Sequence, residues 1–239
     1  MLTETIDVQY SEGVSTVTLS QSRWSGRQAR ELADALDSMA EDRDMRVLVL
    51  RSQAGDFCTG LDADLDVWAV DPSAALGRIR VPVIAGLRGR VESVGLEVAL
   101  AADLRIVSPE AIFRFPEVQE GRIPAWGGTQ RLPRVVSRSV ALRMLLLSEP
   151  ASAPSVPGIA QEIAEDPDLT IAEHVARLLS RGPLALEYAK EAVLSGSELR
   201  LREGLALEAD LNTLLQASRD RAEGVAAFLE KRTPRFEGR

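Results

Sequence analysis

The sequence predicts an α/β protein with a helical C-terminal part, and two observations carry this prediction. Short, continuous apolar runs alternate with helical patterns up to about residue 150, which is typical of buried strands joined by helices. Residues 148–158 carry Pro150, Pro154 and Pro157 and favour a linker or an irregular crossing. Beyond that segment the hydrophobic residues follow helical spacing only. We therefore expect an α/β core over residues 1–150 and a helical region over residues 151–239.

The expected strands begin with a hairpin. Residues 6–10 and 14–19 alternate between apolar and polar side chains, and the segment Ser11-Glu12-Gly13 between them favours a turn. Continuous apolar runs then indicate strands that are buried on both faces, at residues 47–50, 81–85 and 104–107.

The expected helices follow from apolar residues at helical spacing. One is expected over residues 28–41, with Leu32 and Leu36 on its apolar face. Four more are expected in the C-terminal region, over residues 171–181, 184–194, 199–218 and 221–231. The third of these carries an apolar stripe, suited to burial on the core or on another subunit, that consists of Leu201, Leu205, Leu211 and Leu215.

Composition excludes several classes of function. The chain has 28 Lys+Arg and 36 Asp+Glu, and this net charge of −8 argues against nucleic acid or an anionic membrane as the main partner. Only one cysteine, Cys58, and one histidine, His174, are present, so we expect no disulfide framework and no metal site built from these residues. Cys58 is expected to be a packing residue, and His174 a surface or packing residue.

Localisation is expected to be cytoplasmic. The N-terminal residues 1–10 show no basic region followed by an apolar run, so we expect no signal peptide. The longest apolar runs are far shorter than the ~20 residues that a membrane-spanning helix needs.

Three segments of the chain have features that suit chemistry. Residues 56–62 follow a buried strand and contain Gly60, which lets backbone approach a ligand, although a plain strand-to-helix turn explains the same pattern. In residues 93–103, Glu97 is the only charge within an apolar helix, so it lies either on a solvent-exposed face or buried with a raised pKa. In residues 113–132, Glu117 follows a proline and precedes a glycine-rich turn. Two such glutamates in one cleft would suit acid–base catalysis, but their spacing does not show that they meet.

Together these segments resemble the crotonase family, also called the enoyl-CoA hydratase/isomerase superfamily. The stretches that carry the resemblance occur in the family's order: VLVLRSQAGDFCTGLD, VPVIAGLRG, GLEVALAADLRIVSPEAIFRFPEVQEGRIPAWGGTQRLPRVV and AEGVAAFLEKRTPRFEGR. The resemblance implies a core of repeated ββα turns with a helical C-terminal region that mediates trimerisation. Two such trimers commonly stack as a hexamer.

The resemblance also implies an acyl-CoA thioester substrate and a set of site residues. The carbonyl oxygen of the thioester would accept hydrogen bonds from the backbone N–H groups of Leu61 and Val94, which together would form the oxyanion hole. Glu97 would activate water for Cβ and Glu117 would deliver a proton to Cα, which makes hydration of an enoyl-CoA, or the reverse dehydration, the leading interpretation. Coenzyme A would enter as part of the substrate, with no separate cofactor and no metal. The residues expected to contact the substrate are Arg23, Trp24, Thr59, Gly60, Asp62, Ala125 and Trp126.

Other activities stay open because the chain departs from the family pattern. The segment Ser93-Val94-Gly95 stands where the family usually has a run of glycines, and Ala125 replaces a glycine whose N–H is thought to hold the water. The family often has a basic residue just after the first loop, where this chain has Asp64. Contacts with the phosphates of coenzyme A are therefore expected from Arg23, Arg27 or arginines of a neighbouring chain. The alternatives are enoyl-CoA isomerisation, thioester hydrolysis, a carrier-protein thioester as substrate, and a catalytically weak binding or partner subunit.

Overall fold

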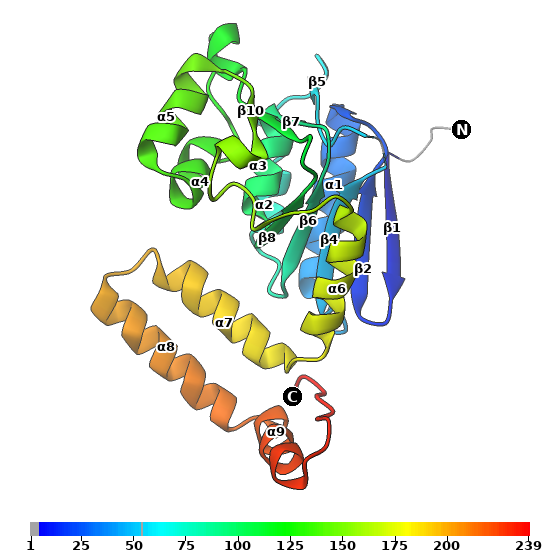
Figure 1. The fold of residues 1–239 in the computed structure, drawn as a ribbon, viewed down its shortest axis with the longest axis vertical. Coiled ribbons are helices and arrows are strands. Elements are labelled where there is room, and N and C mark those ends of the chain that lie inside the picture. The colour runs from blue at the N-terminus through cyan, green and yellow to red at the C-terminus, as the bar shows by residue number, and fades with distance from the viewer. Residues whose placement is uncertain (1–4, 54) are drawn as a thin grey trace. The chain divides into compact units, whose positions relative to one another are not determined.

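The computed structural model describes residues 5–53 and 55–239 (Figure 1). Residues 1–4 and residue 54 lie outside the described residues. Residues 1–4 belong to the N-terminal segment for which no signal peptide is expected. The chain divides into two compact units. The first comprises residues up to 79 together with 83–172, and the second comprises residues 80–82 and 173–239.

A six-stranded sheet forms the centre of the first unit, in the order β1-β2-β4-β6-β8-β11. Strands β1 (Ile6–Ser11) and β2 (Val14–Leu19) pair antiparallel and confirm the predicted hairpin. The remaining strands, β4 (Val47–Ser52), β6 (Val83–Leu87), β8 (Leu104–Val107) and β11 (Glu162–Ile163), continue the sheet in parallel. The predicted buried strands are therefore confirmed, and their unbroken apolar runs fit a sheet that is covered on both faces.

Two small sheets position the loops of the site. One pairs β3 (Arg23–Trp24) with β5 (Gly60–Leu61) in parallel. The other places β9 (Ile112–Arg114) between β7 (Arg90–Glu92) and β10 (Ala151–Ser152). They bring together segments that are far apart in the sequence.

The helices of the first unit differ in how much of their surface is covered. Helix α1 (Gly26–Glu41) is amphipathic as predicted, with Leu32 and Leu36 buried and Ser25 capping its start. Helix α3 (Ser93–Ala101) is instead buried over residues 93–100, on all sides of the helix. The others are α2 (Pro72–Leu76), α4 (Gly128–Val135) and α5 (Arg138–Leu147). No helix in the described part of the chain has the length and apolarity that crossing a bilayer requires.

The segment after residue 150 is irregular, which agrees with the linker or irregular crossing expected over residues 148–158, and α-helices begin only after β11. Residues 151–163 form β10, the 3₁₀ turn η2 (Ala153–Ser155) and β11, all within the first unit. Pro150, Pro154 and Pro157 prevent a continuous helix here. Two-residue strands are too short to leave a periodic signal. The compact units consequently divide near residue 172, not near residue 150.

Helices make up most of the second unit, as predicted. Helix α6 (Pro167–Leu179) runs across the division between the units, and α7 (Pro183–Gly196), α8 (Leu201–Gln216) and α9 (Arg219–Glu230) follow it. Helices α7 and α8 pack against each other as a helical hairpin, closed where Gly196 meets Gly204 (Figure 1).

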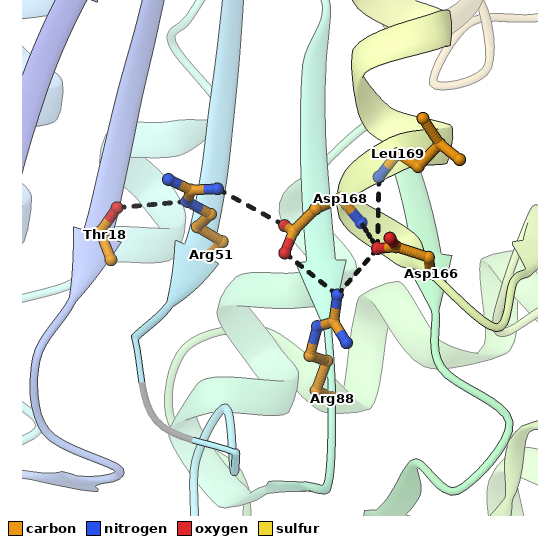
Figure 2. Close-up of polar contacts among 6 residues, drawn as sticks. All are labelled: Thr18, Arg51, Arg88, Asp166, Asp168 and Leu169. Carbon is orange, nitrogen blue, oxygen red and sulfur yellow. Dashed lines mark hydrogen bonds and ion pairs between the residues drawn. The ribbon is translucent and has the colours of Figure 1, made fainter.

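A charged network fixes the start of α6 to the sheet (Figure 2). The carboxylate of Asp166 caps the helix by accepting the N–H groups of Asp168 at 3.1 Å and Leu169 at 3.3 Å. Arg88, which follows β6, donates to both aspartates at 3.3 and 3.0 Å, and Arg51 of β4 contacts Asp168 at 3.5 Å. The end of β6 therefore has a defined position, and β6 leads directly into the site.

Candidate active site

The first loop of the site lies against the start of α3. Cys58 donates its N–H to the carbonyl oxygen of Arg90 at 2.9 Å and accepts the N–H of Glu92 at 2.9 Å. Gly95 allows this approach, because a Cβ on it would lie 2.1 Å from the Cβ of Cys58. Strand β5, which carries Leu61, in turn contacts α3, which carries Val94. The structure therefore brings together the two segments predicted to supply backbone donors.

No side chain in the described part of the chain caps the N-terminus of α3. Its N-cap residue, Glu92, makes no capping hydrogen bond and instead accepts two hydrogen bonds from Arg90, at 2.9 and 2.7 Å. The positive end of the helix dipole lies at this terminus. A developing negative charge placed beside Val94 would be stabilised there.

Glu97 is fully buried in α3 and bound by a turn of backbone. Its Oε2 accepts the N–H groups of Trp126 and Gly128, both at 2.7 Å, and its Oε1 accepts the N–H of Ala125 at 3.2 Å. The structure thus decides between the two interpretations of Glu97 in favour of burial.

Burial dominates the acidity of Glu97. Loss of solvation raises the pKa of its carboxyl from 4.5 to about 7, although the three N–H donors act in the opposite direction. The charge of Glu117 raises the pKa further. A carboxyl with a pKa near neutrality suits proton transfer at physiological pH.

Glu117 begins the 3₁₀ turn η1 (Glu117–Glu120), directly after β9 and the segment Phe115-Pro116. It is buried, and its Oε1 accepts a hydrogen bond of 2.5 Å from the hydroxyl of Ser93. Its Oε2 is also buried and has no hydrogen-bond partner among the described residues. Burial raises the pKa of this carboxyl, and the Ser93 hydrogen bond lowers it by a smaller amount.

Both glutamates are connected to α3. Ser93 and Glu97 lie four residues apart on this helix and therefore share a face. Ser93 binds Glu117, and the effect of Glu117 on the pKa of Glu97 shows that the two carboxyls interact. The sequence alone left open whether they meet, and the structure links both to α3: Glu97 is a residue of this helix, and Glu117 accepts a hydrogen bond from its first residue, Ser93.

Four of the residues predicted to contact substrate come together through the pairing of β3 with β5. Arg23 lies opposite Gly60 and Trp24 lies opposite Leu61, while Thr59 donates its N–H to the carbonyl oxygen of Ser22 at 2.8 Å. Gly60 has a φ of +123°, a conformation that favours glycine.

The basic residues proposed for phosphate contacts are held in ion pairs. Arg23 is exposed and pairs with Asp62 at 2.7 Å, and Arg27 pairs with Glu31 at 2.6 Å. A phosphate bound at either arginine would compete with a carboxylate.

Aromatic residues form a wall beside the glutamates. Trp24 is fully buried, with ring centroids 6.3 Å from both Phe57 and Trp126, and its indole N–H points to the carbonyl oxygen of Phe57 at 3.4 Å. Trp24 therefore supports the site from within the core.

Trp126 is also buried, and it borders a pocket of about 260 Å³. Its indole N–H donates to the carbonyl oxygen of Val67 at 2.9 Å. The other residues that line the pocket are Val67, Trp68, Ala69, Val70, Asp71 and Ala125. Residues 67–71 were not among the predicted site residues, because this short segment carries no motif.

Sequence reasoning also missed the role of Ser93. This residue was noted only as a departure from a glycine pattern, and its contact joins positions that are 24 residues apart. By contrast, Cys58 is buried as expected. Burial raises the pKa of its thiol to about 12, so it stays protonated and is a poor nucleophile.

Comparisons with known proteins agree on one family. Residues 11–239 match the model of the family described as enoyl-CoA hydratase/isomerase. The chain is 37% identical over 227 residues to a 2,3-dehydroadipyl-CoA hydratase of Escherichia coli (strain K12), covering 87% of this chain and 88% of that protein. It is 32% identical over 228 residues to the mitochondrial methylglutaconyl-CoA hydratase of Mus musculus, covering 87% and 73%.

Solved structures share the fold. An enoyl-CoA hydratase from Bacillus anthracis superposes with a TM-score of 0.91 at 27% identity, covering 98% of this chain and 100% of that one. A second structure, of an enoyl-CoA hydratase subunit from Geobacillus kaustophilus HTA426, superposes with a TM-score of 0.87 at 33% identity, covering 98% of both chains.

Proposed function

The chain belongs to the crotonase, or enoyl-CoA hydratase/isomerase, superfamily of enzymes, and from that premise we propose that it adds water across the 2,3 double bond of an enoyl-CoA. The fold class predicted from the sequence, a crotonase-like α/β core, is confirmed by the solved structures that superpose on it. Relatives named as hydratases support a hydratase-like activity.

One observation carries the proposal: two buried glutamates, whose charges influence each other, are both connected to α3, whose N-terminus no described side chain caps. In the proposed reaction the thioester oxygen accepts the N–H groups of Leu61 and Val94. Glu97 takes a proton from water as the water oxygen bonds to C3. The electron pair of the double bond moves to form the enolate, and Glu117 gives its proton to C2, which completes the 3-hydroxyacyl product. Each backbone donor to the enolate oxygen would contribute ~10²–10³ in rate.

The hydrogen bonds favour a distinct role for each carboxyl. Three N–H donors surround Glu97 and stabilise its ionised form, which is the form that a base requires. Burial acts against them and raises the pKa of Glu97 to about 7, so the ionised form is well populated only near neutral pH and above. Glu117 accepts a hydrogen bond from one hydroxyl, and its other oxygen has no partner among the described residues, which suits a carboxyl that carries a proton. The two groups interact, so their titrations belong to the pair and not to either residue alone.

Isomerisation is the second candidate, because both oxygens of Glu97 already accept backbone hydrogen bonds. If these persist with substrate bound, Glu117 alone would move the proton between C2 and C4. The double bond would then shift without uptake of water.

Further parts of the proposal concern the substrate and the assembly. The pocket beside Trp126 offers room for an acyl group, coenzyme A is part of the substrate, and no separate cofactor takes part. We also propose a homotrimer or hexamer. Support comes from the second unit, whose exposed large apolar residues include Leu201, Leu205, Leu214, Phe228 and Leu229.

A set of glutamine variants tests the roles of the glutamates. Glu97→Gln and Glu117→Gln should each lower hydration of enoyl-CoA thioesters by ~10²–10⁴, the usual contribution of acid–base catalysis. Glu149→Gln, at an exposed position, provides the matched control and should retain full activity. Loss of turnover in Glu117→Gln alone would favour the isomerase, and full hydration by both site variants would refute the two-glutamate mechanism.

A further inference from the structure

Ser93 has a backbone conformation that favours glycine. Its φ is +52°, and the other non-glycine residues with positive φ in the described part of the chain are Glu12, Ser148 and Lys231. A serine in this region is less stable than a glycine would be, because its Cβ crowds the following carbonyl oxygen. Local strain of this kind persists where the surrounding structure requires it.

The Ser93 hydroxyl donates a hydrogen bond to the proposed acid. Ser93 is buried, and its hydroxyl donates to Oε1 of Glu117 at 2.5 Å. The contact crosses from the first turn of α3 to the first residue of η1. Glycine would suit the backbone at this position better than serine does, so the hydroxyl is the feature that serine adds.

This hydrogen bond distinguishes the two oxygens of Glu117. Oε1 is occupied by Ser93, whereas Oε2 is buried without a partner among the described residues. A proton on Oε2 is therefore the one available for transfer. Rotation of the carboxyl would exchange the two oxygens, and the Ser93 hydroxyl opposes that rotation.

We propose that Ser93 is a positioning residue, which holds Oε1 of Glu117 so that Oε2 presents the transferable proton to C2 of the substrate. This inference rests on the proposed hydration, and it adds a residue to the site. Other charged groups also act on Glu117: Glu97 on α3 through the interaction of the two carboxyls, Glu120 on η1, and Arg122 in the following turn.

Two variants separate the hydroxyl from the backbone strain. Ser93→Ala removes the hydroxyl and keeps the Cβ, whereas Ser93→Gly removes both. Each should lower kcat by about 10- to 100-fold with KM nearly unchanged, because a misdirected acid impairs the chemical step and not binding. Ser93→Gly should also unfold at a higher temperature than Ser93→Ala.

Ser148 supplies a matched control. It has a φ of +53°, is buried, and its hydroxyl has no hydrogen-bond partner among the described residues. Ser148→Gly should therefore raise the unfolding midpoint by relieving the same strain, with kcat unchanged.

A titration provides a readout that does not need turnover. The Ser93 hydrogen bond lowers the pKa of Glu117, so both Ser93 variants should raise it. Infrared difference spectra can follow the protonated carboxyl band, assigned with Glu117→Gln. The alkaline limb of the kcat profile should move to higher pH by the same amount, since the acid form persists further.

The experiments on Ser93 can fail or succeed independently of the test of the proposed hydration. A raised pKa of Glu117 together with equal losses of kcat in Ser93→Ala and Ser93→Gly would support the positioning role. An unchanged pKa of Glu117, an unchanged kcat, or a loss of kcat in only one of the two variants would overturn it. If the wild type hydrates no enoyl-CoA, the proposed function fails, and the infrared titration still decides whether Ser93 controls Glu117.

Discussion

The two glutamates show how a single residue's surroundings decide its chemistry. Glu97 lies in a helix that is apolar on every side, where an unsolvated carboxylate would be costly. The turn at residues 125–128 offsets part of that cost with three N–H groups. The remaining cost of burial raises the pKa of Glu97 to about 7. Near neutral pH this carboxyl can therefore both release and accept a proton.

The raised pKa of Glu97 predicts how stability depends on pH. Between about pH 4.5 and about pH 7 the folded protein retains a proton that the unfolded chain has released, so the free energy of unfolding falls as pH rises. The fall attributable to Glu97 is up to about 3 kcal/mol. The raised pKa of Glu117 acts in the same direction.

Urea unfolding of wild type and Glu97→Gln over this pH range measures the effect. The difference in unfolding free energy between the two proteins should change steadily across the range, because the variant lacks the titrating group. Glu149→Gln should follow the wild type at every pH. A constant offset between wild type and Glu97→Gln would contradict the burial argument.

Sequence reasoning reached the glutamates but not their partners. The motif around each glutamate is local in the sequence, so a resemblance to a family could identify Glu97 and Glu117. Their hydrogen-bond donors come from Ser93 and the 125–128 turn, which meet the glutamates only after folding. Ala125 was noted as the replacement of a glycine whose N–H is thought to hold the water, and in the structure the Ala125 N–H donates to Glu97.

At the scale of elements, the site depends on the close approach of the first loop to α3. Backbone pairing between Cys58 and the β7 strand holds the loop in place, and Gly95 leaves room for it. This packing sets the separation between the Leu61 and Val94 segments, and therefore the geometry of both proposed backbone donors.

A Gly95→Ala variant tests this packing. The added Cβ would lie 2.1 Å from the Cβ of Cys58, so the loop must move away from the helix. We expect a loss of stability of about 1–3 kcal/mol from overpacking. We also expect a loss of kcat/KM of ~10²-fold or more, from the displaced donors.

Gly55→Ala is the control, since a Cβ there meets nothing within 4 Å. Steady-state kinetics and denaturant unfolding of both variants would measure the two effects. Full activity in a folded Gly95→Ala protein would show that the loop and helix need not be in contact for the reaction.

The elements that could be predicted are those with a long, regular pattern. The hairpin, the parallel strands β4, β6 and β8, and the C-terminal helices have one, and the structure confirms them. The paired strands β3 and β5 are two residues long, as are β10 and β11, and they depend on a distant partner for their conformation. No local pattern identifies such strands.

At the scale of the whole molecule, the second unit leaves apolar side chains uncovered. Leu201 is 80% exposed and Phe228 is 82% exposed, and the predicted stripe on α8 is only partly buried, at Leu211. A monomer gains nothing from such exposure, whereas a subunit contact would remove this surface from water. The exposed residues thus support the proposed trimer or hexamer.

Charged substitutions should break the proposed contact. The double variant Leu201→Glu/Leu205→Glu should sediment as a monomer, whereas the wild type should sediment as a trimer or hexamer. Leu169→Glu, an equivalent change at an exposed leucine in the first unit, is the control and should leave the assembly intact. Analytical ultracentrifugation measures all three, and a monomeric wild type would contradict the proposed assembly.

Product analysis in ¹⁸O-labelled water tests the central claim most directly. The purified protein would be incubated with a panel of short, branched and aromatic enoyl-CoA thioesters, and the products read by mass spectrometry. We predict ¹⁸O in the hydroxyl of a 3-hydroxyacyl-CoA, lost in Glu97→Gln and in Glu117→Gln and retained in Glu149→Gln. An unlabelled product with a shifted double bond, or no product from any thioester, would contradict the proposed hydration.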